Sequence, residues 1–395
     1  MLRTASMRRF SAALRLVGRV AGAAGIGWLA WGHNPFWIGL TPLVFFPWAL
    51  SRHRWQAGLV ALAYYLASSR GIPAGARVFW SRPDEWWMGP TMWIGVSVLL
   101  AILWAITWKA DGRGYWWRVP ALLLLDAIPP LGILDWASPW TAAGVLFPDL
   151  GVIGLAVTLL LCVYLAMAAS SSPARSVGRL ALLAVFAIAA NLLYVRPVPP
   201  SGWQGINTQV LPYNDPYAVQ AALLHQASAA ARHGARVVVL PEEVAGSWFA
   251  GTSFVWHNWQ ANHPGVTALV GAAYPLPHHR YLDAIMDTRN GQPWAARIPI
   301  PVSEWRPWSR HWSAIAHWFG SGIRHLDGRR VGYLVCYEQV LIWPEISLVF
   351  AHPAVLVAVA NDWWAVHSNI TAIQHEDVTV WARLMGVPPV RAVNA

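Results

Sequence analysis

A succession of apolar runs in the first half of the chain constrains the fold more than any other feature. Short basic or Pro/Gly-rich connections separate these runs. A helix of about 20 apolar residues spans a bilayer, and shorter runs form re-entrant or irregular pieces. The seven predicted spans are Ala12–Trp31, Phe36–Leu50, Trp55–Ser68, Thr91–Trp108, Val119–Leu134, Gly151–Ala169 and Leu180–Val195. The sequence therefore predicts an α-helical membrane bundle over residues 1–196.

The composition supports a membrane protein. Hydrophobic residues make up 56% of the chain and charged residues 12%, whereas about 25% of a soluble domain is charged. The 28 tryptophans also fit, because this side chain gathers at membrane–water interfaces. A net charge of +10 could indicate a nucleic-acid partner. Most arginines flank apolar segments, however, so membrane topology explains the charge better and no direct nucleic-acid binding is expected.

The basic residues also predict an orientation, since lysine and arginine concentrate in cytoplasmic connections. Alternate connections hold Arg52, Arg54, Lys109, Arg113, Arg118, Arg175 and Arg179, whereas the connection with Arg70, Arg77 and Arg82 departs from the pattern. Seven crossings from a cytoplasmic N-terminus place everything after Val195 outside. The prediction is a multi-pass protein of the bacterial inner membrane, in contact with the lipid bilayer, whose C-terminal domain is periplasmic.

The second half of the chain has the pattern of an α/β domain. Residues 197–203 form a Pro-rich linker, and residues 204–395 alternate predicted strands with helices, which favours a layered α/β architecture. The predicted strands are Gly205–Leu211, Arg236–Leu240, Val266–Ala273, Tyr281–Asp287, Gly332–Val335, Ala354–Ala360 and Pro389–Val393. The predicted helices are Asp215–His233, with Asp215 as N-cap, and Ile370–Met385.

The chain has two cysteines. Cys162 lies in an apolar run and Cys336 in a water-soluble stretch, so a disulfide between them is not expected. The sequence holds no cluster of cysteine and histidine residues. We therefore expect no metal site and no cofactor.

Polar residues follow three of the predicted strands, where α/β folds usually place reactive groups. Glu242 follows the strand Arg236–Leu240, and a carboxylate held there beside apolar neighbours can accept a proton near neutral pH. Cys336 ends the strand Gly332–Val335, as a nucleophile would. Taken alone, the first is more often a solvated turn and the second an inert buried cysteine.

The third position follows the strand Ala354–Ala360, where Asn361 and Asp362 precede Trp363 and Trp364. These residues offer polar groups and aromatic walls beside the same sheet edge. The alternative is a helix cap with packing tryptophans.

In this order, Pro-Glu, Cys-Tyr-Glu and Asn-Asp-Trp resemble the motifs of the nitrilase (carbon–nitrogen hydrolase) superfamily. The chain resembles the membrane branch of that superfamily, which includes apolipoprotein N-acyltransferase, and it looks more like the TraB-type conjugal transfer proteins. The resemblance covers nearly the whole chain and implies a nitrilase-type sandwich domain after the bundle. The acyltransferases continue beyond the Arg-x-x-Asn strand, so the resemblance implies either a C-terminus that is truncated here or a shorter branch of the family.

The resemblance also implies roles for individual residues. It makes Cys336 the nucleophile, Glu242 the base and Glu338 a supporting carboxylate. The segment Pro301-Val302-Ser303-Glu304 resembles the Pro-x-Gly-Glu of the acyltransferases, which adds Glu304 to the catalytic candidates. The implied substrate-binding residues are Tyr337, Asn361, Trp363 and Trp364.

One departure concerns the catalytic lysine of the family, which stabilises the oxyanion. The single lysine of this chain, Lys109, lies in a connection of the bundle, and Arg297 is the nearest cation in the matching stretch. An arginine can hold an oxyanion through charge-assisted hydrogen bonds but does not readily give up a proton. The chemistry is therefore modified, or the acyltransferase reaction has been lost.

Three functions remain open from the sequence. The leading one is Cys-dependent amide or acyl transfer at the periplasmic membrane face, serving a conjugative transfer apparatus. Its expected substrate is a phospholipid or a membrane-anchored peptide. The alternatives are an apolipoprotein N-acyltransferase and a non-catalytic assembly factor that keeps the nitrilase fold.

Overall fold

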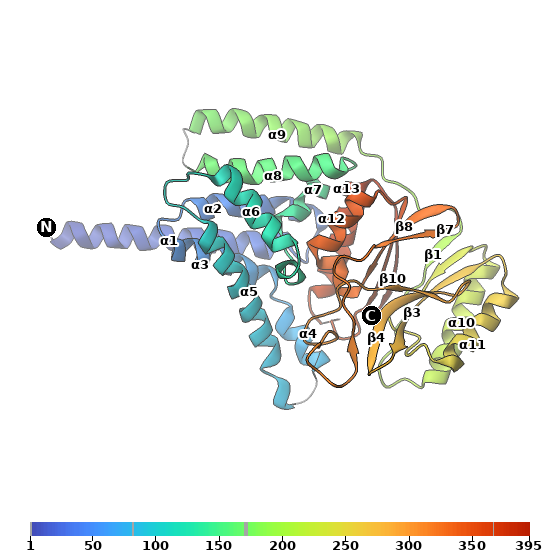
Figure 1. Cartoon of the computed structure of the whole chain (residues 1–395). Helices are drawn as coiled ribbons and strands as arrows, with labels where there is room; N and C mark the ends of the chain where they lie inside the picture. The colour runs from blue at the N-terminus through green and yellow to red at the C-terminus, as the bar shows by residue number, and fades with distance from the viewer. Residues whose placement is uncertain (1, 81–82, 170–172, 366) are drawn as a thin grey trace. The chain divides into compact units, whose positions relative to one another are not determined.

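The computed structural model describes residues 2–80, 83–169, 173–365 and 367–395, and the side chains of 2–9, 83, 173–177 and 179 are left out of the description. Arg82, Arg175 and Arg179 of the orientation argument thus lie outside the described side chains. The chain forms two compact units (Figure 1). A helical unit comprises residues 1–195 and 367–384, and an α/β unit comprises residues 196–366 and 385–395.

Short helices make up much of the helical unit. In chain order its helices are α1 (Leu2–Ala30), η1 (Pro35–Val44), α2 (Phe45–Ala49), α3 (Arg54–Ser68), α4 (Ile72–Phe79), η2 (Pro83–Glu85), α5 (Met88–Thr107), α6 (Tyr115–Ala127), η3 (Leu131–Ile133), η4 (Pro139–Thr141), α7 (Ala142–Leu146), α8 (Gly151–Ala168), α9 (Pro173–Leu193) and α13 (Ile370–Met385).

Among the described residues, three helical segments are long and apolar enough to cross a membrane. They are Phe10–Ala30, Met88–Thr107 and Gly151–Ala168. The seven predicted spans are therefore not supported. A helix rises about 1.5 Å per residue, so the 15 residues of α3 fall well short of a hydrocarbon layer about 30 Å thick. The 13 residues of α6 fall shorter still.

Helices α1 and α3 approach closely through a glycine. A Cβ on Gly27 would clash with the carbonyl oxygen of Tyr64, so a larger residue would push the helices apart. Buried polar groups bond to one another in the same unit. The Trp31 indole donates to the Tyr64 hydroxyl at 3.2 Å, and the Trp104 indole donates to Asp126 Oδ2 at 3.0 Å.

Helix α13 belongs to the helical unit although it lies late in the sequence. Glu376 accepts a hydrogen bond from the Gly32 backbone N–H at 2.8 Å. Arg383 donates to Asn191 Oδ1 at 2.8 Å. A Cβ on Gly144 would clash with the backbone carbonyl of Val380, so α13 lies directly against α7.

The α/β unit contains two sheets and several helices. Its strands are β1 (Trp203–Gly205), β2 (Val237–Val239), β3 (Thr267–Leu276), β4 (Arg280–Asp287), β5 (Gln292–Ala295), β6 (Ser313–Ala314), β7 (Ile323–Leu326), β8 (Arg329–Val335), β9 (Val355–Asn361) and β10 (Pro389–Asn394). Its helices are α10 (Pro216–Arg232), α11 (Ala250–Asn262), η5 (Cys336–Val340) and α12 (Ile342–Ala351).

The two sheets have mixed topology. The first has the order β1-β2-β3-β4-β5, with β6 paired to β4, and the second has the order β10-β9-β8-β7. Strands β1, β2 and β3 run parallel, as do β8, β9 and β10. The carboxyl ends of β8 and β9 therefore meet at one edge of their sheet.

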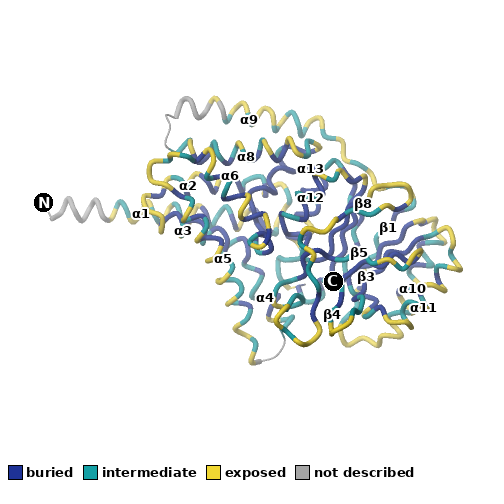
Figure 2. Tube along the Cα trace, viewed as in Figure 1, coloured by how far each residue is buried: buried dark blue, intermediate teal, exposed yellow. Residues whose placement is uncertain are grey.

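Alternation along the strands builds two core layers. Val237 and Val239 of β2 pack with Val357 and Val359 of β9 in a core between the sheets. Val238 points the other way and packs with residues of α10 and α11. This is the expected α/β sandwich, and the buried strands appear dark blue in Figure 2.

Most predicted elements of the second half are confirmed. Helix α10 begins after Asp215, whose carboxylate accepts from the Ala218 N–H at 2.9 Å, so the predicted N-cap is correct. Helix α13 has the predicted bounds, Ile370–Met385. The strand predicted over Gly205–Leu211 is wrong in position, since β1 covers Trp203–Gly205. The sequence interpretation missed β5, β6, β7 and α11.

Candidate active site

Three strand ends bring Glu242, Cys336 and Asn361 together in the α/β unit. Glu242 follows β2, Cys336 directly follows β8, and Asn361 is the last residue of β9. The Cys336 thiol donates a hydrogen bond to the Glu242 carboxylate. Glu242 Oε2 also accepts from the Asn361 backbone N–H at 2.7 Å. The site thus pairs a thiol with a carboxylate whose position is fixed by the neighbouring strand.

The backbone at Cys336 is held in an unusual conformation. Its φ of +46° lies in the left-handed region, which residues with a Cβ rarely adopt. Such strain persists where the surrounding structure over-determines it, and it gathers at active sites. The side chain is only 5% exposed. Burial first, and then the nearby carboxylates of Glu242 and Glu304, raise the pKa of the Cys336 thiol well above its usual value.

Glu242 is buried, and its surroundings favour the protonated form. Burial raises the pKa of Glu242 well above its usual range, and the carboxylates of Glu304 and Glu243 raise it further. The hydrogen bond from Cys336 acts in the opposite direction. In its ionised form, a carboxyl group with a raised pKa is a stronger base, so it can take a proton from a neighbouring thiol and later return that proton to a leaving group.

The backbone at Pro241 and Glu242 lies directly against Gly271 of β3. The close contact leaves no room for a side chain at residue 271. A Cβ there would clash with the Pro241 carbonyl oxygen and lie 2.5 Å from Glu242 Cα. Gly271→Ala is therefore expected to destabilise the protein by about 1–3 kcal/mol through overpacking. Thermal unfolding of the purified protein measures the effect. Gly251→Ala is the control, because nothing lies within 4 Å of its added Cβ; equal unfolding temperatures for both variants would contradict the prediction.

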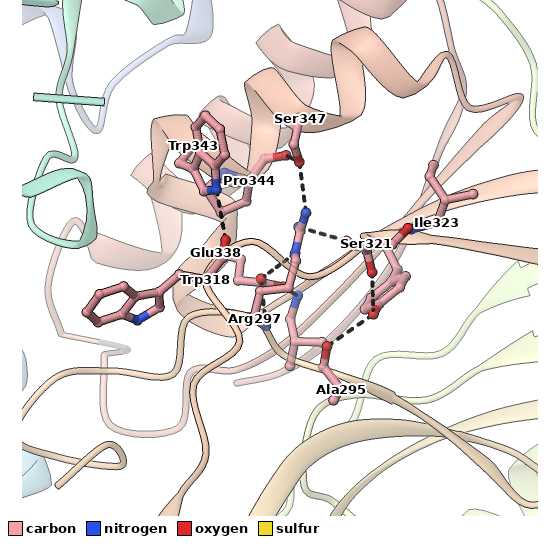
Figure 3. A network of polar contacts seen from close by, with 11 residues as sticks. Ala295, Arg297, Trp318, Ser321, Ile323, Glu338, Trp343, Pro344 and Ser347 are labelled. Atoms are coloured by element: carbon pink, nitrogen blue, oxygen red, sulfur yellow. Dashed lines mark hydrogen bonds and ion pairs between the residues drawn. The ribbon is translucent and has the colours of Figure 1, made fainter. Parts of the chain in front are cut away.

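Arg297 and Glu338 form a buried ion pair. The backbone N–H and Nε of Arg297 both donate to Glu338 Oε1, at 2.9 and 2.8 Å. Arg297 Nη1 donates to Ser347 Oγ at 2.9 Å, and Nη2 donates to the Tyr333 carbonyl at 3.4 Å (Figure 3). Glu338 Oε2 accepts from the Val335 N–H at 3.1 Å. The ion pair therefore connects the segment after β5 to Val335, the last residue of β8, which directly precedes Cys336.

The other predicted site residues lie around this centre. Glu304 accepts from the Ile300 N–H at 2.9 Å, and its charge acts on both Glu242 and Cys336. Tyr337 follows Cys336 in η5 and is partly buried. Trp363 and Trp364 are partly buried in the turn after β9. The substrate-binding roles of these aromatic residues stay predictions.

The sequence interpretation missed Asn394 and Asp283, and it named Asp362 after the strand Ala354–Ala360 without giving this residue a catalytic or binding role. Asn394, at the end of β10, donates to Asn361 Oδ1 at 2.7 Å. Asp362 is 1% exposed, and its charge acts on Glu242 and Cys336. Asp283 lies within β4, inside an otherwise apolar run. The sequence signal for Asp283 was an acidic residue inside an apolar strand, at a position that would be buried.

Comparison with known proteins places the chain in a family. It is 34% identical over 394 residues to the conjugal transfer protein TraB of Agrobacterium fabrum, covering 93% of this chain and 90% of that protein. It is 30% identical over 358 residues to a probable conjugal transfer protein TraB of Sinorhizobium fredii, covering 88% and 90%. The chain belongs to the TraB family of conjugal transfer proteins. No protein-family profile matches the sequence.

Solved structures similar to this TraB-family chain include members of the nitrilase superfamily. An amidase from Nesterenkonia is 12% identical, with a TM-score of 0.36, over 50% of this chain and 79% of the amidase. A glutamine-dependent NAD+ synthetase from Acinetobacter baumannii is 11% identical, with a TM-score of 0.31, over 40% of this chain and 31% of the synthetase.

Proposed function

We propose that this TraB-family protein is a Cys336-dependent enzyme of amide or acyl transfer that supports conjugal transfer at the periplasmic face of the inner membrane. One observation carries the proposal: the Cys336 thiol donates to the buried carboxylate of Glu242, where the ends of β2, β8 and β9 meet. A thiol beside a carboxylate base is one arrangement that activates a nucleophile for covalent catalysis.

The proposed reaction has two steps. Glu242 takes the proton from Cys336 Sγ as the sulfur attacks an ester or amide carbonyl carbon. The tetrahedral intermediate collapses, the bond to the leaving alcohol or amine breaks, and Glu242 returns its proton to that group. Water or another nucleophile then attacks the thioester and releases Cys336 as a thiol.

Arg297 was expected to hold the oxyanion of this reaction, and that role stays a prediction. Its contacts favour a different one. The guanidinium is 2% exposed and donates to Glu338, Ser347 and the Tyr333 carbonyl. We propose that Arg297 is a positioning residue, which holds the end of β8 and therefore Cys336 in place.

The proposed location rests on the apolar helices. Three helical segments of the described residues could cross a bilayer. If the N-terminus is cytoplasmic and the number of crossings is odd, the α/β unit lies in the periplasm, and this location stays a prediction. A substrate anchored in the bilayer, either a phospholipid or a membrane-anchored peptide, would suit an enzyme on that surface.

The test replaces Cys336 with alanine. Cys336→Ala is expected to lower plasmid transfer at least about tenfold and to abolish labelling by an alkyne-bearing phospholipid, because no thioester can form. Cys162→Ala is the matched control, since Cys162 is a buried cysteine of α8 in the helical unit. Transfer at the wild-type frequency from Cys336→Ala, with no label on the native protein, would instead support a non-catalytic assembly factor.

A further inference from the structure

Five carboxyl side chains interact with one another beside the Cys336 thiol, which donates to one of them, and we call them the carboxyl cluster. They are Glu242, Glu243, Asp283, Glu304 and Asp362. The charges of Glu304, Glu243 and Asp362 act on Glu242, and those of Glu242, Glu304 and Glu243 act on Asp283. Burial is the largest influence on the pKa values of Glu242 and Asp283, followed by the other carboxylates, and both influences raise them.

Asp283 is the member that points to a ligand. It is 3% exposed, and neither carboxylate oxygen has a hydrogen-bond partner among the described residues. It shares its face of β4 with Ile285, which belongs to the core between the sheets, as Cys336 does. The side chain therefore lies on the side of β4 that faces the core between the sheets, where the Glu242 carboxylate acts on it. Burying a carboxylate without a hydrogen-bond partner costs free energy, which implies that a ligand group binds to the carboxyl cluster.

Arg297, a buried cation of the same unit, does not meet this need. Arg297 is committed to Glu338, whose carboxylate accepts from its Nε at 2.8 Å. Burying several like charges without compensation is unfavourable, so the cluster holds protons or receives a positive group. Burial raises the pKa of Glu243 to about 7 and that of Glu304 to about 8, so both can exchange a proton for a cation near neutral pH.

An aromatic side chain completes the surroundings. The ring of Tyr281 stacks on that of Trp312, with centroids 5.1 Å apart and planes 7° from parallel. The charges of Glu304, Glu243 and Asp283 all act on Tyr281, which lies two residues before Asp283 on β4. Ammonium groups bind well where carboxylates and aromatic faces meet.

The chemistry of the ligand follows from these residues. Among the described residues, no group of three or more histidine, cysteine and acidic side chains is arranged to hold a metal ion. We infer that the carboxyl cluster binds a positively charged amine group of the substrate beside the Cys336 thiol. This inference rests on the proposed function, and it names the class of substrate: an ester or amide that carries an ammonium group.

The test compares two thiol reagents of opposite charge on the full-length protein in detergent, with Cys162→Ala as background. The reagents are 2-aminoethyl methanethiosulfonate, a cation, and 2-sulfonatoethyl methanethiosulfonate, an anion. Relative to free cysteine, the cation is expected to modify Cys336 at least about tenfold faster than the anion. Asp283→Asn is expected to reduce this preference at least about threefold.

Asp287→Asn is the matched control, because Asp287 is a buried carboxylate on the same strand that is paired with Arg289 at 2.9 Å. It should leave the preference unchanged. A cation preference at Cys336 equal to that of free cysteine would overturn the inference, as would an unchanged preference in Asp283→Asn. The proposed function fails separately, through wild-type transfer from Cys336→Ala.

Thermal unfolding decides the matter if neither reagent reaches the buried thiol. The diamine 1,4-diaminobutane is expected to raise the unfolding temperature by about 2 °C at saturation, whereas the neutral 1,4-butanediol should not. Asp283→Asn should abolish the difference. Equal unfolding temperatures in diamine and diol would overturn the inference.

Discussion

Replacing Arg297 with leucine is expected to lower the free energy of unfolding by about 3–5 kcal/mol, because it leaves the buried Glu338 carboxylate without its cation. Glu338 is fully buried and Arg297 is 2% exposed, so water cannot take the place of the lost partner. Urea unfolding of the purified protein in detergent, followed by tryptophan fluorescence, measures the change.

Arg236→Leu is the control for this result. Arg236 pairs with Asp327 at 3.5 Å, but its side chain is 57% exposed, so the expected loss is at most about 1 kcal/mol. Arg297→Lys should recover only part of the stability, since a lysine lacks the guanidinium fork. A stable Arg297→Leu protein that has lost labelling would contradict the positioning role and favour the oxyanion role.

The second large effect is expected for Glu242→Gln, which should slow thioester formation at Cys336 by about 10²–10⁴-fold. The same substitution should lower the pKa of the thiol. The carboxylate of Glu242 raises that pKa by its charge and by accepting the thiol hydrogen bond, and glutamine removes the charge. The pH dependence of alkylation by iodoacetamide should therefore shift to lower pH.

A slower reaction together with a lower thiol pKa distinguishes a general base from a residue that acts on Cys336 only through its charge. If Glu242 affected only the thiol pKa, its removal would increase the thiolate and speed the reaction. Asp327→Asn serves as the control, because this carboxylate pairs with Arg236 elsewhere in the unit. Unchanged labelling in Glu242→Gln would contradict the role of Glu242 as base.

The centre of the site could be predicted because it depends on local rules. Glu242, Cys336 and Asn361 each follow or end a buried strand that is readable from its apolar run, and parallel strands bring such ends together. The positive φ at Cys336 could not be predicted, since it depends on the surrounding contacts and not on the residue type.

Contacts between residues far apart in the chain could not be predicted from the sequence. Nothing near Arg297 in the chain indicates that its guanidinium bonds to Glu338, 41 residues later. The inward direction of Asp283 depends on the register of β4 against β3, which hydrogen bonding between the strands sets. The seven predicted spans exceed the three segments of the described residues that are long and apolar enough to cross a membrane, because apolar runs were counted without knowing where each helix ends.

The place of α13 has a consequence for the order of folding. Domains generally fold as units, N-terminal first, as the ribosome delivers them. Here the helical unit receives α13 only after strands β1 to β9 have been synthesised, and β10 of the α/β unit follows α13. The helical unit is therefore completed only when most of the α/β unit has been synthesised, and the α/β unit is completed after it. Their maturation is interlocked, and a pause in translation before residue 370 would leave both unfinished together.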